Sequence, residues 1–320
     1  MYRRKKMIEN QESVTAKLCS FARAYHSSFE HDRIFDDGLA FDMMGLDEFE
    51  SMGLLIQHGF KFLRENAHYG FNRSVVTPVL TRCIMPIPIS RIAFTEKELS
   101  AFIEKNPVCQ YVICGAGMDS FSFRNTHRNV RVFEIDHPDT QKYKKEKIRR
   151  LEWIVPENVS FVPVDFSKDN MAENLIKNGF DPDLPSFFAL PGVLYYLTPS
   201  VFEETLKKIS SVSAPHTEIV FDFPDETTFL PDVPDRIKEL RLITEKLGEK
   251  MRHGYSTAEI NAALRKSGFA PVVHKTPEDI QKTYFSNRTD GLSAFENVHF
   301  VKAERRKHDE KNSKFYGQPR

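Results

Sequence analysis

Two short stretches of the chain carry residue types that could hold a nucleoside. Gly115-Ala116-Gly117 follows an apolar run that ends at Cys114, and Asp136 closes the next apolar run, about 20 residues further on. Paired glycines let a backbone turn tightly and approach a ligand closely. An acid at that distance reaches ribose hydroxyls. Each feature alone also fits a structural turn or a capping acid, but together they predict a site for a nucleoside-bearing cofactor.

Neighbouring residues discriminate between cofactors. A dinucleotide site favours a third glycine where this chain has Ser120, whereas S-adenosylmethionine has no phosphates and needs no such packing. Asp165 and Phe166 follow the third apolar run and could bind adenine by a hydrogen bond and a stacked ring, although Asp165 could instead cap the next helix. Tyr195 and Tyr196 follow the fourth run and could line an acceptor pocket, although a core position for one of them is the simpler interpretation.

The elements that must position these residues alternate along the chain. Short runs that are apolar on both faces alternate with helical segments, which is typical of a parallel sheet covered on both sides. Pro138 suits the first turn of one such helix. We therefore expect an α/β fold with a doubly wound, mostly parallel, seven-stranded Rossmann-like sheet. The expected strands are 108–114, 130–135, 159–164, 186–190, 218–223 and an antiparallel edge formed by 271–275 and 296–303.

The residues ahead of the sheet, 13–105, are expected to be mainly helical, with Leu18 and Phe21 on one apolar face. Pro86 and Pro88 should break any helix at 85–90, so that a further helix begins near residue 91. We expect one domain over the whole chain. Its expected parts are an N-terminal helical cap (1–107), a Rossmann-like core (108–303) with an insertion (224–255), and a charged tail (304–320).

Composition limits the classes of partner. Lys plus Arg and Asp plus Glu both number 45, so no global field steers the protein to nucleic acid or an anionic membrane. The four cysteines lack the spacing of a zinc site or a disulfide framework. No apolar run resembles a signal peptide or reaches the ~20 residues of a membrane span. We expect a cytoplasmic protein that acts on a small molecule or peptide, without a metal.

Five segments resemble the leucine carboxyl methyltransferase family, including its bacterial branch of polyketide-type O-methyltransferases. The specific part of the resemblance is GAGxD followed, at this spacing, by FExDxP. It implies a class I S-adenosylmethionine-dependent methyltransferase that methylates a carboxylate or hydroxyl oxygen of a small molecule or peptide. The segments are TAK…YH (15–26), YVICGAGMDSFSFR (111–124), FEIDHP (133–138), FVPVDF (161–166) and GVLYYLT (192–198).

The resemblance also implies roles for single residues. Lys17 and Arg91 match family ligands of the methionine carboxylate, and a cation on a helix folded over the cofactor could form that pair. Pro191 stands where eukaryotic members carry a glutamate, which argues against the specific methylation of a phosphatase's C-terminal leucine. The expected cofactor residues are Lys17, Arg91, Gly115, Ala116, Gly117, Asp136 for the ribose, Asp165 with Phe166 for the adenine, and Pro191.

The chemistry does not require a catalytic base for every acceptor. An ionised carboxylate can attack the methyl group directly, whereas a hydroxyl needs a base. His26, His137, Tyr195 and Tyr196 are candidates, but each also fits a structural or pocket-lining role, so no base is assigned. A nicotinamide-dependent oxidoreductase and a non-catalytic protein that keeps the fold remain as alternatives. The expected acceptor pocket comprises Tyr25, His26, Tyr195 and Tyr196.

Overall fold

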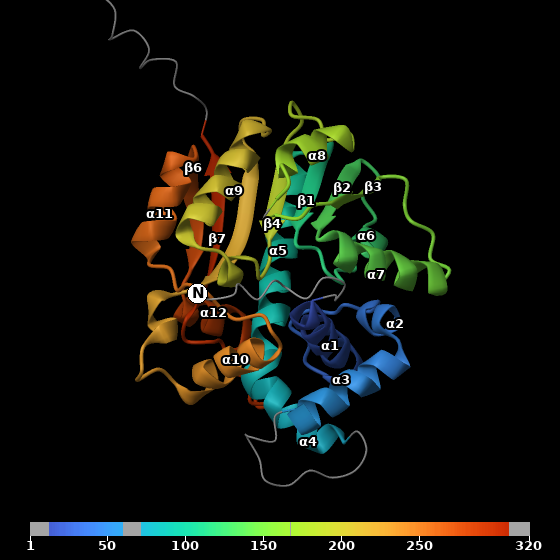
Figure 1. Cartoon of the computed structure of the whole chain (residues 1–320), viewed down its shortest axis with the longest axis vertical. Helices are drawn as coiled ribbons and strands as arrows, with labels where there is room; N and C mark the ends of the chain where they lie inside the picture. Colours follow the sequence, from blue (N-terminus) through green and yellow to red (C-terminus); the bar gives the residue numbers. More distant parts are fainter. Residues whose placement is uncertain (1–12, 60–71, 167, 307–320) are drawn as a thin grey trace, which may run out of the picture.

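A computed structural model describes residues 13–59, 72–166 and 168–306. Its centre is a seven-stranded sheet in the order β3-β2-β1-β4-β5-β7-β6 (Figure 1). Strands β1 to β5 are mutually parallel, so their carboxyl ends lie at one edge, and β7 runs antiparallel to both of its neighbours. The strands are β1 (Cys109–Cys114), β2 (Val130–Asp136), β3 (Val159–Pro163), β4 (Ser186–Leu190), β5 (Glu218–Pro224), β6 (Phe269–Lys275) and β7 (Val298–Arg305).

The seven predicted strands and the α/β class are confirmed, and the sheet is mixed rather than wholly parallel. Strand β6 forms the outer edge, while β7 is inserted between β5 and β6. Strands β1, β2, β4 and β5 are buried on both faces because helices cover both, which explains their lack of alternation, whereas the outer strand β3 is only partly buried.

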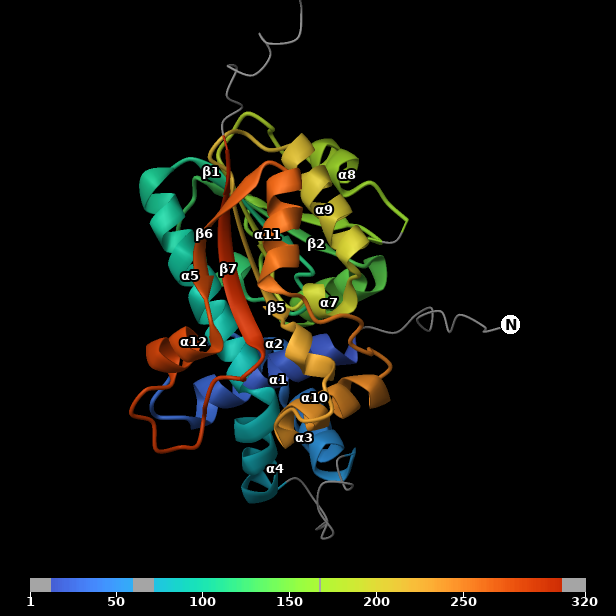
Figure 2. The same ribbon diagram turned by 90° about the vertical axis from the view of Figure 1, so that its left-hand side faces the viewer.

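Two helical layers enclose the sheet. Helix α5 (Pro86–Lys105) packs on one face, and α8 (Met171–Lys177), α9 (Pro199–Ser211) and α11 (Thr257–Lys266) pack on the other (Figure 2). The capping box that Ser256 and Glu259 form starts α11. The remaining helices after β1 are α6 (Phe121–Arg124), α7 (Pro138–Arg150), η3 (Leu194–Tyr196), η4 (Glu226–Phe229), α10 (Asp235–Lys246) and α12 (Pro277–Tyr284).

The helices that precede α5 gather near the edge where β1 to β5 end (Figure 1). Helix α1 is the one that approaches the first strand's loop, since Ala16 lies beside Gly117. Helix α1 begins at the cap Ser13, whose hydroxyl accepts a hydrogen bond from the Ala16 amide. These helices are α1 (Val14–Phe29), α2 (Ala40–Met44), α3 (Leu46–Gly59), α4 (Arg73–Val79) and η2 (Leu80–Ile84).

The expectation that Pro86 and Pro88 exclude a helix is wrong. Helix α5 begins at Pro86 itself, five residues earlier than predicted, counting back from 91. Both prolines fall in its first turn, where the missing N–H groups would have no intrahelical partner in any case. The two prolines therefore begin this helix instead of excluding it.

No single helix within the described ranges has the length and apolar composition of a membrane span. One bent pair, Arg73–Ile84 with Pro86–Lys105, passes that test together, but its two halves meet at 57°.

Candidate functional site

The loop after β1 turns sharply and is enclosed on both sides. Gly115 and Gly117 have φ of 76° and 52°, the left-handed region that favours glycine. The amides of Gly115 and Ala116 donate to the carbonyl of Ile135 on β2, at 2.8 and 3.0 Å. A Cβ on Gly115 would lie 3.2 Å from Val193. The loop thus has little room for larger residues, and its backbone faces the carboxyl edge of the sheet.

Asp136, at the end of β2, points its carboxylate toward this loop. One oxygen accepts from the Gly117 amide at 2.5 Å and the other from the His137 amide at 2.7 Å. Burial raises the pKa of Asp136, while the two amide hydrogen bonds and the charge of Lys144 act in the opposite direction. A carboxylate has about four acceptor positions, so each oxygen can still accept a ligand hydroxyl. This arrangement fits a ribose.

Asp165 and Phe166 lie just past the end of β3, next to the end of β2. Asp165 is 3.9 Å from the His137 ring and 2.7 Å from Lys168. It does not cap the next helix, since the cap of α8 is Asn170. Phe166 is partly buried against the core on the α8 side. The predicted ribose and adenine residues therefore lie side by side.

A second cluster surrounds the turn after β4. Arg91, on α5, pairs with the buried carboxylate of Asp222 at 3.2 Å. Asp222 also accepts from the Tyr195 hydroxyl at 3.0 Å and from the Gly192 amide at 2.7 Å. A Cβ on Gly192 would lie 2.6 Å from the Arg91 guanidinium, so this turn packs directly on the arginine.

Asp222 was not predicted from the sequence. A signal was present, because this acid interrupts the apolar run of β5, and a buried acid requires hydrogen-bonding or charged partners. Pro191 lies partly buried one residue before Gly192, at the same turn.

Lys17 faces another part of the edge. Its ammonium group is 3.1 Å from Glu48 of α3 and 4.5 Å from the centre of the Tyr143 ring on α7. Lys147 binds the same glutamate at 2.6 Å. The predicted role of Lys17 as a ligand of the methionine carboxylate stays a prediction, and it requires that Lys17 exchange or share Glu48.

The four predicted pocket residues divide into two pairs. Tyr195 and Tyr196 lie beside Arg91, with ring centres 6.4 Å apart. Tyr25 packs against Phe29 and Phe49, and its hydroxyl is 2.5 Å from the hydroxyl of Thr77. The pocket role of the first pair fits this position, and that of Tyr25 stays a prediction.

His26 is also placed among the N-terminal helices. Its Nε2 accepts the Ile34 amide at 2.9 Å, and burial, aided by the charge of Arg288, lowers its pKa to about 4. A neutral ring that accepts a backbone amide is a structural arrangement. The predicted place of His26 in the acceptor pocket likewise stays a prediction.

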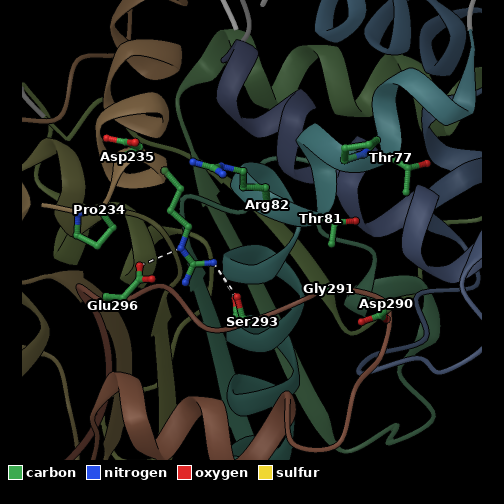
Figure 3. A pocket seen from close by; sticks show the side chains of 11 residues that line it. Thr77, Thr81, Arg82, Pro234, Asp235, Asp290, Gly291, Ser293 and Glu296 are labelled. Carbon is green, nitrogen blue, oxygen red and sulfur yellow. Dashed lines mark hydrogen bonds and ion pairs between the residues drawn. The ribbon is translucent and has the colours of Figure 1, made fainter. Parts of the chain in front are cut away.

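A cavity of about 670 Å³ opens elsewhere, between α4, η2, the start of α10 and residues 290–296 (Figure 3). Arg236 is one of its lining residues and donates to Glu296 and Ser293, both at 2.9 Å. Its lining contains none of the predicted cofactor residues, but it includes Thr77, the partner of Tyr25. Among the described residues, no group of three or more His, Cys, Asp or Glu side chains is placed to bind a metal ion.

Comparison with known proteins gives three findings. Residues 16–210 match the family model described as leucine carboxyl methyltransferase. A Bacillus subtilis (strain 168) protein, provisionally named an S-adenosyl-L-methionine-dependent methyltransferase, is 35% identical over 303 residues, which are 93% of this chain and 99% of that protein. The solved magnesium protoporphyrin IX methyltransferase from Synechocystis, with bound S-adenosylhomocysteine, is 12% identical with a TM-score of 0.44, and the match covers 83% of this chain and 100% of that one.

Proposed function

Because the chain belongs to the leucine carboxyl methyltransferase family, we propose that this S-adenosylmethionine-dependent methyltransferase transfers the methyl group to an oxygen of a small molecule or peptide. The observation that carries the proposal is the joint position of the glycine loop, Asp136 and the Arg91 cluster along the carboxyl edge of β1 to β5. In open α/β sheets, ligands bind outside this edge, where the strand order reverses. Here the reversal lies between β1 and β4.

The residues at this edge fit the cofactor from one end to the other. The two acceptor positions left on Asp136 suit the ribose hydroxyls, and Asp165 with Phe166 suits the adenine. Arg91 suits the methionine carboxylate, because a guanidinium can pair with two carboxylates through separate N–H groups. Helix α1 then covers the cofactor as part of an N-terminal helical cap.

The protonation of the two tyrosines beside Arg91 favours a carboxylate acceptor over a hydroxyl. When bound, S-adenosylmethionine supplies an electrophilic methyl group, and an oxygen attacks that methyl in line with the departing sulfur. Burial raises the pKa of Tyr195 and of Tyr196, and Asp222 raises that of Tyr195 further, so neither phenol is ionised to act as a base at neutral pH. An acceptor that is already ionised needs no base.

The acceptor atom can be identified with a radiolabelled methyl donor. The protein is incubated with methyl-labelled S-adenosylmethionine and a panel of carboxylic acids, acidic peptides and phenols, and each product is then treated with mild base. A methyl ester releases labelled methanol under these conditions, whereas a methyl ether or a methylamine keeps its label. We expect base-labile product from at least one carboxylate. Base-stable product alone, in which mass spectrometry places the methyl on nitrogen or carbon, would overturn the proposal.

A further inference from the structure

Asp222 is a buried charged residue that meets donors from several elements. Its side chain is fully buried near the end of β5. The Gly192 amide, the Tyr195 hydroxyl and the Arg91 guanidinium all donate to its two oxygens, at 2.7, 3.0 and 3.2 Å. These donors belong to the turn after β4, to η3 and to α5, which are brought together only in the folded chain.

Such a carboxylate is stable in the interior only when it is paired and hydrogen-bonded. The geometry also restricts the arginine. Gly192 packs against the guanidinium, where a Cβ would lie only 2.6 Å away, while Asp222 holds one of the terminal nitrogens. The other terminal nitrogen lies 3.8 Å from the Cys19 sulfur of α1, and sulfur is a weak acceptor. This second terminal nitrogen can therefore pair with an additional carboxylate.

We infer that Asp222 is a positioning residue, which fixes the Arg91 guanidinium for the methionine carboxylate of the cofactor and holds Tyr195 beside it. The inference rests on the proposed placement of the cofactor. Asp222 contributes in two ways. It orients the fork of the guanidinium, and its charge offsets that of Arg91, whose side chain is only 13% exposed. Without this partner, the arginine would have no fixed acceptor and would lose its preorganised orientation.

The test compares two ligands that differ in the methionine moiety. S-adenosylhomocysteine carries the amino-acid carboxylate, and 5′-methylthioadenosine has the same adenosine without it. We expect Asp222→Asn to raise the Kd for S-adenosylhomocysteine about tenfold or more, as when a charge-assisted hydrogen bond is lost. The Kd for 5′-methylthioadenosine should change by less than about twofold, and calorimetry measures both values.

Glu218→Gln is a matched control, because Glu218 is another buried acid of β5 and pairs with Lys302 at the opposite end of the strand. It should leave both Kd values unchanged. If Asp222→Asn weakened the binding of both ligands equally, Asp222 would have only a structural role. If it weakened the binding of neither ligand, the inference would also be overturned. Since no acceptor is present, these outcomes are independent of the acceptor chemistry. Failure of the wild-type chain to bind S-adenosylhomocysteine would instead refute the proposed function.

A second comparison covers the case in which Asp222→Asn alone does not fold. Arg91→Met and Arg91→Met/Asp222→Asn are compared, because the double variant leaves no unpaired charge in the interior. If Asp222 acts through Arg91, the two variants bind S-adenosylhomocysteine with Kd values within about twofold of each other. A further tenfold loss in the double variant would show that Asp222 acts by another route.

Discussion

At the scale of single residues, the site depends on how many donors the fold supplies to each carboxylate. Asp136 receives two backbone amides, which orient it and leave acceptor positions for a ligand. Asp222 receives three donors, one of them the guanidinium of Arg91, and is enclosed by protein. We therefore propose that the same residue type binds ligand in one place and positions another side chain in the other.

Replacement of Asp136 by alanine should weaken S-adenosylhomocysteine binding by about 1.5–3 kcal/mol, the range of hydrogen bonds to a charged group. Calorimetry measures the change. Asp139→Asn is the control, because Asp139 lies in the first turn of α7 but is about one-third exposed, and its side chain faces His137. Unchanged affinity in the Asp136→Ala variant would refute the ribose role.

The wild type and the Asp136→Ala variant should also differ in how their affinity for S-adenosylhomocysteine depends on pH. Asp136 accepts two hydroxyls only when it is ionised, and burial raises its pKa above the usual 3.8. Wild-type affinity should therefore fall as the pH falls through this raised pKa, at a higher pH than an ordinary aspartate would give. The residual affinity of the Asp136→Ala variant should lack this transition.

At the scale of elements, a buried ion network joins the N-terminal helices to the glycine loop. Asp37, fully buried, pairs with Arg23 and accepts the Ser120 hydroxyl, both at 2.5 Å, while Arg124 lies 3.3 Å away. Arg23 also donates to the carbonyl of Met118 at 2.7 Å. Ser120, which stands where a dinucleotide site would have its third glycine, thus helps to hold the loop after β1 against α1.

Loss of this network should destabilise the fold. Asp37→Asn is expected to lower the free energy of unfolding by about 3 kcal/mol, because it leaves Arg23 partly unpaired in the interior. Asp36→Asn is the matched control, since Asp36 forms a surface pair with Arg33 and its replacement should change stability by about 0.5 kcal/mol or less. Urea unfolding measures both. A loss for Asp37→Asn no larger than that of the control would contradict the account.

The difference in the free energy of unfolding between the wild type and Asp37→Asn should depend on pH, and this dependence follows from the pKa of Asp37. Burial alone would raise that pKa, but the charges of Arg23 and Arg124 and the Ser120 hydrogen bond lower it below 3.8 overall. A lowered folded-state pKa means that the ionised carboxylate stabilises the fold above pH 3.8, and that this contribution is lost as the pH falls further. The difference in the free energy of unfolding between the wild type and Asp37→Asn should therefore become smaller below about pH 4.

Much of this element-level structure followed from local sequence. The apolar runs and proline positions predicted the strands and the start of α7, because burial on two faces and the missing proline N–H leave a local signal. The start of α5 was mispredicted, since a proline pair both breaks and begins helices. Ser120 could not be assigned its partner, because Asp37 lies 83 residues away in the chain.

At the scale of the whole molecule, the strand order brings the site residues to one edge. Residues on or just after β2 and β3, and a residue of α5, lie at this edge because β1 to β5 are parallel. The order of the strands in the sheet reverses between β1 and β4. The positions of Asp136 and of the glycine loop could be predicted, since Asp136 ends one strand and the glycine loop directly follows another. The placement of Tyr25 and His26 among the N-terminal helices could not, because it depends on how those helices pack.

The most direct measurement is a crystal structure of the protein with S-adenosylhomocysteine. The account predicts the ribose hydroxyls within hydrogen-bond distance of Asp136, the adenine beside Asp165 and Phe166, and the amino-acid carboxylate on Arg91. A ligand in the cavity lined by Arg236, or anywhere else away from the ends of β1 to β3, would contradict this prediction.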